Sequence, residues 1–294
     1  MKAMLRYLIS LLFYQKNKKK TEEYLKEAHN KVELSDFEGA IQDYDKAIEI
    51  KPNYASFYYC RGIAKGRLSD TGGAIQDFNK AIDINSNYVE AYTLRGRAKY
   101  FLEDCIGALQ DYNKAIQIDP NCAEAYLHRG IAKGGLPAIY LENISGGISA
   151  IQDFSKAIRI NPNYIQAYLL RGISRSFIKD YNGAVQDYNK AIELNPNYDE
   201  AYYFRGEAKL ELGDKNGACL DWSKAGELGY IEAYDAIKEY CKWKSWTKGL
   251  TEQKYSFPMG MRFHSWVLSY KDITPMVLRK KVFISYMISM KRFE

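Results

Sequence analysis

"GAVQDYNKAIELNPNY", residues 183–198, repeats with few changes the stretches "GAIQDYDKAIEIKPNY" at 39–54 and "GAIQDFNKAIDINSNY" at 73–88. The alanine of "KAI" or its equivalent recurs at intervals of 34, 34, 42, 34 and 34 residues, at Ala47, Ala81, Ala115, Ala157, Ala191 and Ala225. The glycine of an Arg-Gly pair keeps the same step, at Gly62, Gly96, Gly130, Gly172 and Gly206. A fixed period of this length predicts stacked units that bury their apolar faces only against their neighbours.

Each unit is predicted to contain two helices. In the third unit, residues 89–102 contain no proline, and residues 107–118 place apolar side chains at the spacings of one helix face. An aspartate precedes each second helix as a candidate N-cap, at Asp36, Asp70, Asp104, Asp180 and Asp214. A proline follows most of these helices and should end them, at Pro52, Pro120, Pro162 and Pro196. The repeated unit is therefore a helical hairpin.

These residues resemble the tetratricopeptide repeat (TPR) family. The family pattern of aromatic and small residues followed by proline is matched in one unit by Tyr168, Gly172, Ala184, Tyr188, Ala191 and Pro196, and in another by Tyr92, Gly96, Ala108, Tyr112, Ala115 and Pro120. The resemblance implies an all-α fold, a right-handed α-solenoid of six helix-turn-helix units with a C-terminal capping helix. The expected units are 21–54, 55–88, 89–122, 123–164, 165–198 and 199–232, and the expected capping helix is 231–242.

Three features depart from the pattern. The first unit has Ala28 in place of the glycine, and the second and sixth have Ser86 and Tyr230 in place of the proline. The fourth unit has thirteen residues, 137–149, where five are expected between its helices, and we interpret the surplus as a longer surface turn. The solenoid of residues 21–242 is flanked by an N-terminal segment, 1–20, and a C-terminal tail, 243–294, neither of which matches the repeat.

The charge is unevenly distributed along the chain. Residues 1–20 carry +6 and residues 243–294 carry +7, so that residues 21–242 carry −7 within a total of +6. The recurring Asp and Lys three residues apart, such as Asp187 and Lys190, are interpreted as solvated pairs. The five cysteines include no C-x-x-C motif, which indicates reduced, packed thiols and a cytoplasmic protein.

No sequence motif supports catalysis. The three histidines, His29, His128 and His264, belong to no cysteine or serine motif, and neither a glycine-rich phosphate loop nor H-E-x-x-H is present. We therefore expect no enzyme activity and no catalytic residue, cofactor, metal or small-molecule substrate.

The resemblance instead implies a protein-interaction scaffold whose first helices line a concave groove. The residues predicted to line it are Tyr59, Ile63, Arg97, Tyr100, Leu127, Ile131, Leu169, Ile173, Tyr203 and Glu207. The centre is apolar, and glutamates surround it, which predicts a partner segment with aliphatic anchors and basic flanks. TPR co-chaperones hold a chaperone's C-terminal carboxylate with asparagines and basic residues, but the corresponding positions here contain no asparagine, so no binding of that kind is expected.

The two ends leave alternatives open. The apolar run Tyr7–Tyr14 is shorter than the ~20 residues that span a bilayer, and lysines follow where a signal peptide would be cleaved. The alternative to a cytoplasmic flank is an interfacial helix on an anionic membrane, in which case the protein is a membrane-associated assembly or adaptor factor. The basic tail could occupy the chain's own groove or be an unselected extension; nucleic-acid binding is not expected, because its charges follow no helix face.

Overall fold

The computed structural model describes residues 2–134 and 144–241, and this part of the chain is entirely helical, with no strand. The helices are α1 (Lys2–Glu33), α2 (Phe37–Ile50), α3 (Ala55–Arg67), α4 (Thr71–Ile84), α5 (Val89–Phe101), α6 (Cys105–Ile118), α7 (Ala123–Gly134), α8 (Ile144–Ile160), α9 (Ile165–Phe177), α10 (Tyr181–Leu194), α11 (Asp199–Glu211), α12 (Lys215–Glu227) and α13 (Glu232–Tyr240).

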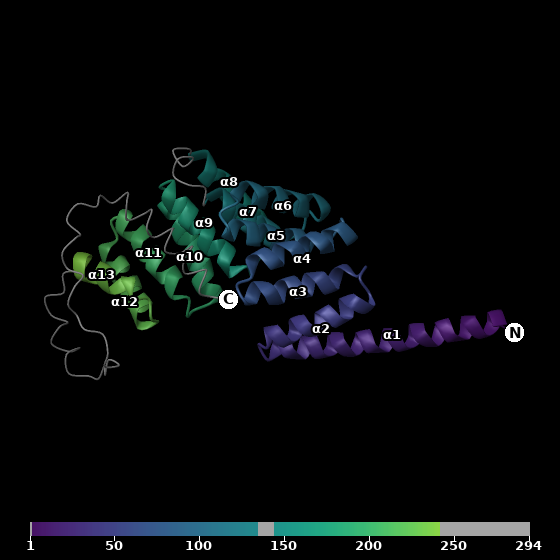
Figure 1. The fold of residues 1–294 in the computed structure, drawn as a ribbon. Coiled ribbons are helices and arrows are strands. Elements are labelled where there is room, and N and C mark those ends of the chain that lie inside the picture. The colour runs from purple at the N-terminus through teal and green to yellow at the C-terminus, as the bar shows by residue number, and fades with distance from the viewer. Residues whose placement is uncertain (1, 135–143, 242–294) are drawn as a thin grey trace, which may run out of the picture.

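Consecutive helices pair as hairpins, and the hairpins stack side by side in chain order. The tightest contacts join α1 to α2, α3 to α4, and so on to α11 and α12, and each hairpin then packs on the next. Figure 1 shows the resulting curved array, with α13 against the last pair. The predicted solenoid of six helix-turn-helix units with a capping helix is therefore confirmed.

The predicted caps position the second helix of five units. The carboxylate of each aspartate accepts a hydrogen bond from the backbone N–H three residues on, as Asp180 does from Gly183 at 3.0 Å. The same bond is present at Asp36, Asp70, Asp104 and Asp214, at 2.9 Å. It satisfies one of the amides that a helix start leaves unpaired, so that the turn between the two helices is kept short.

A close approach between the two helices of a unit requires the glycine of the Arg-Gly pair. A Cβ atom added to Gly172 of α9 would lie 2.5 Å from the ring of Tyr188 in α10. A Cβ added at the equivalent glycines would lie 2.6 to 2.8 Å from an aromatic ring of the second helix; the pairs are Gly62 with Phe78, Gly96 with Tyr112, Gly130 with Phe154, and Gly206 with Trp222. The aromatic ring of the second helix therefore lies directly on the backbone of the first helix.

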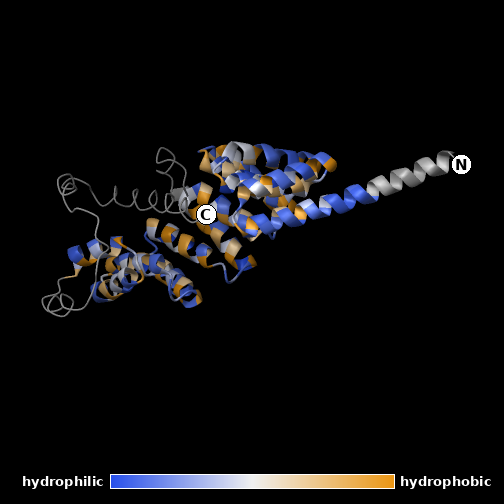
Figure 2. Cartoon of the chain, turned by 60° about the horizontal axis from the view of Figure 1, so that its bottom comes forward, coloured by the Kyte–Doolittle hydropathy of each residue, from blue (hydrophilic) through white to orange (hydrophobic). Residues whose placement is uncertain are grey.

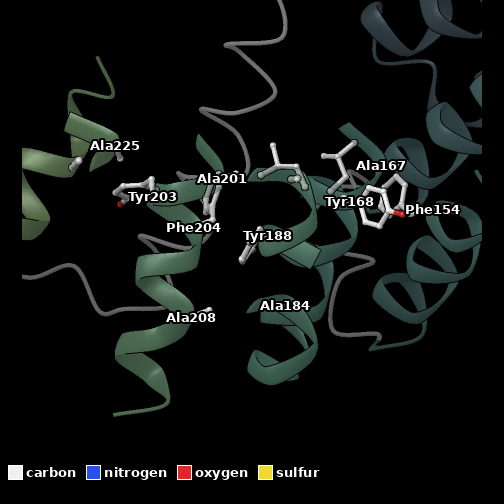
Figure 3. Close-up of a cluster of buried hydrophobic side chains, with 14 of the residues drawn as sticks. Phe154, Ala167, Tyr168, Ala184, Tyr188, Ala201, Tyr203, Phe204, Ala208 and Ala225 are labelled. Atoms are coloured by element: carbon white, nitrogen blue, oxygen red, sulfur yellow. The ribbon is translucent and has the colours of Figure 1, made fainter. Parts of the chain in front are cut away.

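The apolar core continues from one unit into the next. Ala191 in α10 and Ala201 in α11 are fully buried, as expected where the second helix meets the following unit. Figure 3 shows Tyr188 and Phe204 between these two helices, and their ring centroids are 6.3 Å apart. Because neighbouring units share this core, each unit depends on the next for burial of its apolar face.

A buried carboxylate joins the two helices of each unit. Asp187 in α10 is 2% exposed and accepts hydrogen bonds from Arg171 of α9, at 3.0 Å from Nε and 2.6 Å from Nη2. Arg175, one turn further along α9, donates to the same carboxylate at 2.9 Å. The arrangement recurs as Arg61 with Asp77, Arg95 with Asp111, Arg129 with Asp153, and Arg205 with Asp221.

The same arginines link each unit to the one before it. Nη1 of Arg171 donates to the hydroxyl of Ser155 in α8 at 3.1 Å, and Nη1 of Arg205 donates to the side chain of Asn189 in α10 at 2.7 Å. The corresponding acceptors in the other units are Asp45, Asn79 and Asn113. We call this series of arginines, aspartates and acceptors the arginine ladder.

The arginine ladder corrects our interpretation of the recurring Asp–Lys spacing as solvated pairs. The aspartate is buried in all six units, at Asp43, Asp77, Asp111, Asp153, Asp187 and Asp221. Its cation comes from the first helix, sixteen residues earlier in most units, because the hairpin brings the two positions together. The pairing at a spacing of three residues occurs in the first unit, where Lys46 bonds Asp43 at 2.9 Å and Lys31 bonds the same carboxylate.

Two other expectations differ from the structure in their boundaries. Helix α8 already begins at Ile144, so that Gly146 and Gly147, which we assigned to a longer turn, lie in its first turn. Gly147 packs closely on Ile178, since an added Cβ would lie 3.3 Å from that side chain. Helix α1 runs without a break across residues 20 and 21, where we expected a flank to meet the first unit. The tail, 243–294, and residues 137–143 of the predicted surplus lie outside the described residues.

A disulfide joins the capping helix to the last unit. Cys219 in α12 is bonded to Cys241, which directly follows α13, over a Cα–Cα distance of 5.9 Å. Our expectation that all five cysteines are reduced is therefore wrong at these two positions, because the capping helix brings together two thiols that are 22 residues apart in the sequence. Cys60, Cys105 and Cys122 are free thiols.

Candidate partner-binding face

The first helices of the third to sixth units, α5, α7, α9 and α11, form one continuous layer. Besides packing on its own second helix, α5 contacts α7, α7 contacts α9, and α9 contacts α11. The side chains that these helices turn away from the second helices therefore lie next to one another across several units. We call this surface the first-helix face, and all the residues that the sequence analysis predicted to bind a partner belong to the first helices α3, α5, α7, α9 and α11.

The predicted site residues divide into two groups by exposure. Six are half-buried and accessible at the surface: Tyr59, Ile63, Arg97, Tyr100, Ile173 and Glu207. Four are buried: Leu127, Ile131, Leu169 and Tyr203. Leu127 and Leu169 have no exposed surface and belong to the core shared by the last three units. The accessible part of this face is therefore less apolar at its centre than the sequence pattern indicates.

Aromatic and acidic side chains meet on the first-helix face of the second to fourth units. The rings of Tyr59 and Tyr88 lie 5.0 Å apart, and burial raises the pKa of both phenols, that of Tyr88 to about 12. The negative charges of Glu90 and Glu124 raise the pKa of Tyr59 further. Glu90 and Glu124 are exposed, each in the first turn of its helix, so that their carboxylates are available to a cation from outside.

Glu124 also interacts with basic side chains of this chain. Its carboxylate lies 3.7 Å from Nε2 of His128, one turn along α7. A hydrogen bond from His128, and the positive charge of Arg97 on α5, hold the pKa of Glu124 below its usual value. The Glu124 carboxylate is therefore charged at neutral pH and contributes to a negative potential on this part of the face.

A second acidic cluster lies where the last unit meets the capping helix. The rings of Tyr203 and Tyr230 lie 4.6 Å apart, and the charge of Glu207 acts on both. Burial, reinforced by the neighbouring charge of Asp199, raises the pKa of Glu200 to about 7. Glu200 therefore changes its charge near neutral pH, unlike a solvated glutamate.

The raised pKa of Glu200 predicts a measurable pH dependence of stability. Since the folded state holds this proton more tightly than the unfolded state, the contribution of Glu200 is fully present below about pH 4.5 and is lost as the pH rises through about 7. We expect Glu200→Gln to raise the free energy of unfolding at pH 8 by ~1–3 kcal/mol and to change it little at pH 4.5. Urea unfolding at the two pH values measures this difference.

The control for that experiment is Glu90→Gln, the same change at an exposed glutamate of α5. We expect it to leave the pH dependence as it is in the unsubstituted protein. An equal gain from Glu200→Gln at pH 4.5 and pH 8 would contradict the prediction, since it would mean that amide packing, and not titration, stabilises the variant.

The acidic, histidine and cysteine side chains of the described residues lack the grouping that a metal ion requires. Among residues 2–134 and 144–241, no three histidine, cysteine, aspartate or glutamate side chains are grouped closely enough to hold a metal ion. Each buried aspartate is paired with an arginine or a lysine. This pairing gives the buried carboxylates a structural role.

Comparison with known proteins agrees with the geometry. The chain is built from repeated helical hairpins, and the TPR repeat profile matches residues 29–69, 106–136 and 179–213. The chain therefore contains tetratricopeptide repeats in these three segments, and proteins built from such repeats act as protein-interaction scaffolds. Among curated proteins, none matches this chain.

Several solved structures share the fold. The structure of PilF from Pseudomonas aeruginosa has a TM-score of 0.65 at 16% identity and covers 76% of this chain and 98% of that chain. YrrB has a TM-score of 0.53 at 19% identity and covers 66% of this chain and 97% of that chain. MamA has a TM-score of 0.50 at 24% identity and covers 61% of this chain and 97% of that chain. At these identities the likeness is one of fold.

Proposed function

We propose that this protein is a non-catalytic scaffold and that the first-helix face of residues 21–242 binds an extended or helical segment of a partner protein. The supporting observation is that two exposed carboxylates, Glu90 and Glu124, lie in the first turns of adjacent first helices, close enough to the half-buried ring of Tyr59 for both charges to raise its pKa. A segment with basic flanks would pair with the carboxylates, and its aliphatic or aromatic anchors would cover this ring.

The ends of the face favour the same kind of partner. Ile63 on α3 and Ile173 on α9 are half-buried apolar side chains that a ligand could cover, while Glu207 on α11 adds an acidic group. YrrB, which shares the fold, is described as a TPR protein with an unusual peptide-binding site. A stack of these hairpins can therefore bind a peptide, and the side chains that line the binding face determine which peptide is bound.

Screening the full chain against a peptide array tests the proposal. The array would contain nine-residue peptides that vary independently in aliphatic and in basic content. We expect retention of peptides that combine aliphatic residues with flanking Lys or Arg. We expect Glu90→Lys with Glu124→Lys to weaken the best of these peptides at least tenfold, measured as Kd by fluorescence anisotropy, because two favourable charge contacts become repulsive.

The matched control reverses two exposed carboxylates on second helices, Glu49→Lys in α2 and Asp83→Lys in α4. It changes the net charge equally and should leave the Kd within about twofold. An equal loss in both variants would show that binding follows net charge alone, and an array with no basic preference would overturn the proposal. Circular dichroism is needed for both variants, because Glu90 and Glu124 also lie in the first turns of helices, where acidic residues stabilise the helix.

A second pair of substitutions tests the apolar contacts between the first-helix face and the peptide. Ile131 is 4% exposed, so that an aspartate there would test folding, not binding. The half-buried Ile63 and Ile173 are better sites, and replacement of both by serine should weaken the same peptide while the array stays folded.

A further inference from the structure

Helix α1 is much longer than the helix on which it packs. It contains 32 residues against 14 in α2, whereas α3, α5, α9 and α11 contain 13 each. At a rise of about 1.5 Å per residue, the surplus over a typical first helix of this array corresponds to roughly 28 Å. Figure 1 shows the N-terminal half of α1 continuing past the end of α2 and away from the other helices. We call residues 2–20 the projecting segment.

The described side chains agree with this placement. Lys16, Lys18, Lys19 and Lys20 are exposed, and Thr21, at 1% exposure, is the first described side chain of α1 that is buried. Figure 2 shows this stretch as strongly hydrophilic where α1 approaches the array. Packing against the array therefore begins near Thr21, and the lysines stand clear of it.

The sequence of the projecting segment combines an apolar run with positive charge. The run from Tyr7 to Tyr14 contains a single polar side chain between its tyrosines, that of Ser10. Lys2 and Arg6 precede the run and the four lysines follow it, and no acidic residue occurs before Glu22. The sequence of this helix is thus apolar in its middle and positively charged on both sides of the apolar run.

We propose that the projecting segment binds the surface of an anionic membrane. The apolar run enters the boundary between headgroups and acyl chains, and the lysines lie among the anionic headgroups. An eight-residue helical run is about 12 Å long and lies in this boundary without crossing the bilayer. Within the described part of the chain, no helix combines the length and the apolar character that crossing a membrane requires. The positive charge of the projecting segment favours binding to anionic lipid over pairing with a second copy of the helix. The lysines of two such helices would repel one another.

Membrane binding through α1 is independent of the peptide-binding proposal, because α1 projects from one end of the array, whereas the first-helix face extends over α3 to α11. A protein with both surfaces would hold a partner segment close to a membrane.

Co-sedimentation of the full chain with phospholipid vesicles tests the inference. We expect binding to vesicles of phosphatidylcholine with 30 mol% phosphatidylserine, at least tenfold weaker binding to phosphatidylcholine alone, and weakening as salt screens the lysines. Leu8→Asp with Leu12→Asp should abolish binding. Replacement of Lys16, Lys18, Lys19 and Lys20 by glutamine should weaken it at least tenfold.

Matched controls make the same chemical changes on the array. Ile106→Asp with Leu220→Asp alters two residues that are 71% and 66% exposed. Replacement by glutamine of the exposed Lys80, Lys114, Lys215 and Lys238 removes the same charge. Both controls should bind vesicles as the unsubstituted chain does. Absence of binding to anionic vesicles would overturn the inference, as would equal binding by the Leu8→Asp, Leu12→Asp variant. The inference would also be overturned if sedimentation velocity without lipid showed that the unsubstituted chain is a dimer and that the Leu8→Asp, Leu12→Asp variant is not.

Discussion

Replacing Asp187 with alanine is expected to destabilise the fifth unit by ~2–4 kcal/mol. The substitution removes the carboxylate shared by Arg171 and Arg175, whose side chains are 15% and 24% exposed. Breaking a buried ion pair by removing one partner costs ~3–5 kcal/mol, because the remaining charge is left without compensation. The expected loss of stability is smaller than this range here, because both guanidinium groups retain some contact with water.

Urea unfolding, together with hydrogen exchange of α9 and α10, measures this effect. Neighbouring units should lose less protection, because stability in such an array is a sum of unit and interface contributions. The control is Glu193→Ala, which removes the exposed partner of Lys190 one turn further along α10 and should change stability by less than ~0.5 kcal/mol. A loss below ~1 kcal/mol for Asp187→Ala would mean that the two arginines reach water freely once released.

Replacing Trp222 with alanine is expected to cost ~3–5 kcal/mol, the range for removing a large aromatic side chain from a core. Trp222 in α12 is 1% exposed, its ring lies on Gly206 of α11, and its Nε1 donates to the carbonyl of Tyr203 at 3.2 Å. The ring also lies 5.7 Å from that of Tyr240 in the capping helix. The change therefore removes packing for α11, α12 and α13 together.

Trp222→Phe is the matched variant, because Phe78 and Phe154 occupy the same position in two other units. A phenyl ring still covers Gly206 but loses the hydrogen bond to Tyr203, so we expect a cost below half of that for alanine. Equal losses for the two variants would show that this hydrogen bond matters more than the volume of the ring. Thermal unfolding followed by near-ultraviolet circular dichroism distinguishes these outcomes.

The fold could be predicted from the sequence because its information is local and repeated. The interval of 34 residues, the aspartates before the second helices and the prolines after them define each hairpin without knowledge of distant contacts. The arginine ladder was missed, although its signal was visible: each arginine of the Arg-Gly pairs lies sixteen residues before an aspartate in four units and 24 in the one that contains the insertion. Sequence separation alone does not show that a hairpin brings these two positions into contact.

The candidate site was less predictable than the fold. Register on a helix places Leu127 and Leu169 on the same side as Tyr59 and Ile63, yet the first pair is fully buried and the second pair is accessible. The exposure of a side chain on a first helix depends on how closely the next unit approaches it. That distance is set by the packing of the units on one another. The backbone conformation of the turns was not predictable from residue type either. Ser69 and Lys179 adopt positive φ angles in turns where the last unit has Gly213.

The sequence by itself determined the class of fold, the number of hairpins and the helix starts, because periodicity, caps and helix breakers act over a few residues. Only the tertiary structure decided which aspartates are buried and paired, which site residues remain accessible, that Cys219 meets Cys241, and that α1 projects beyond α2. Each of these depends on contacts between residues far apart along the chain. Such contacts form only when the hairpins stack, because the packing of one unit on the next determines what is removed from water.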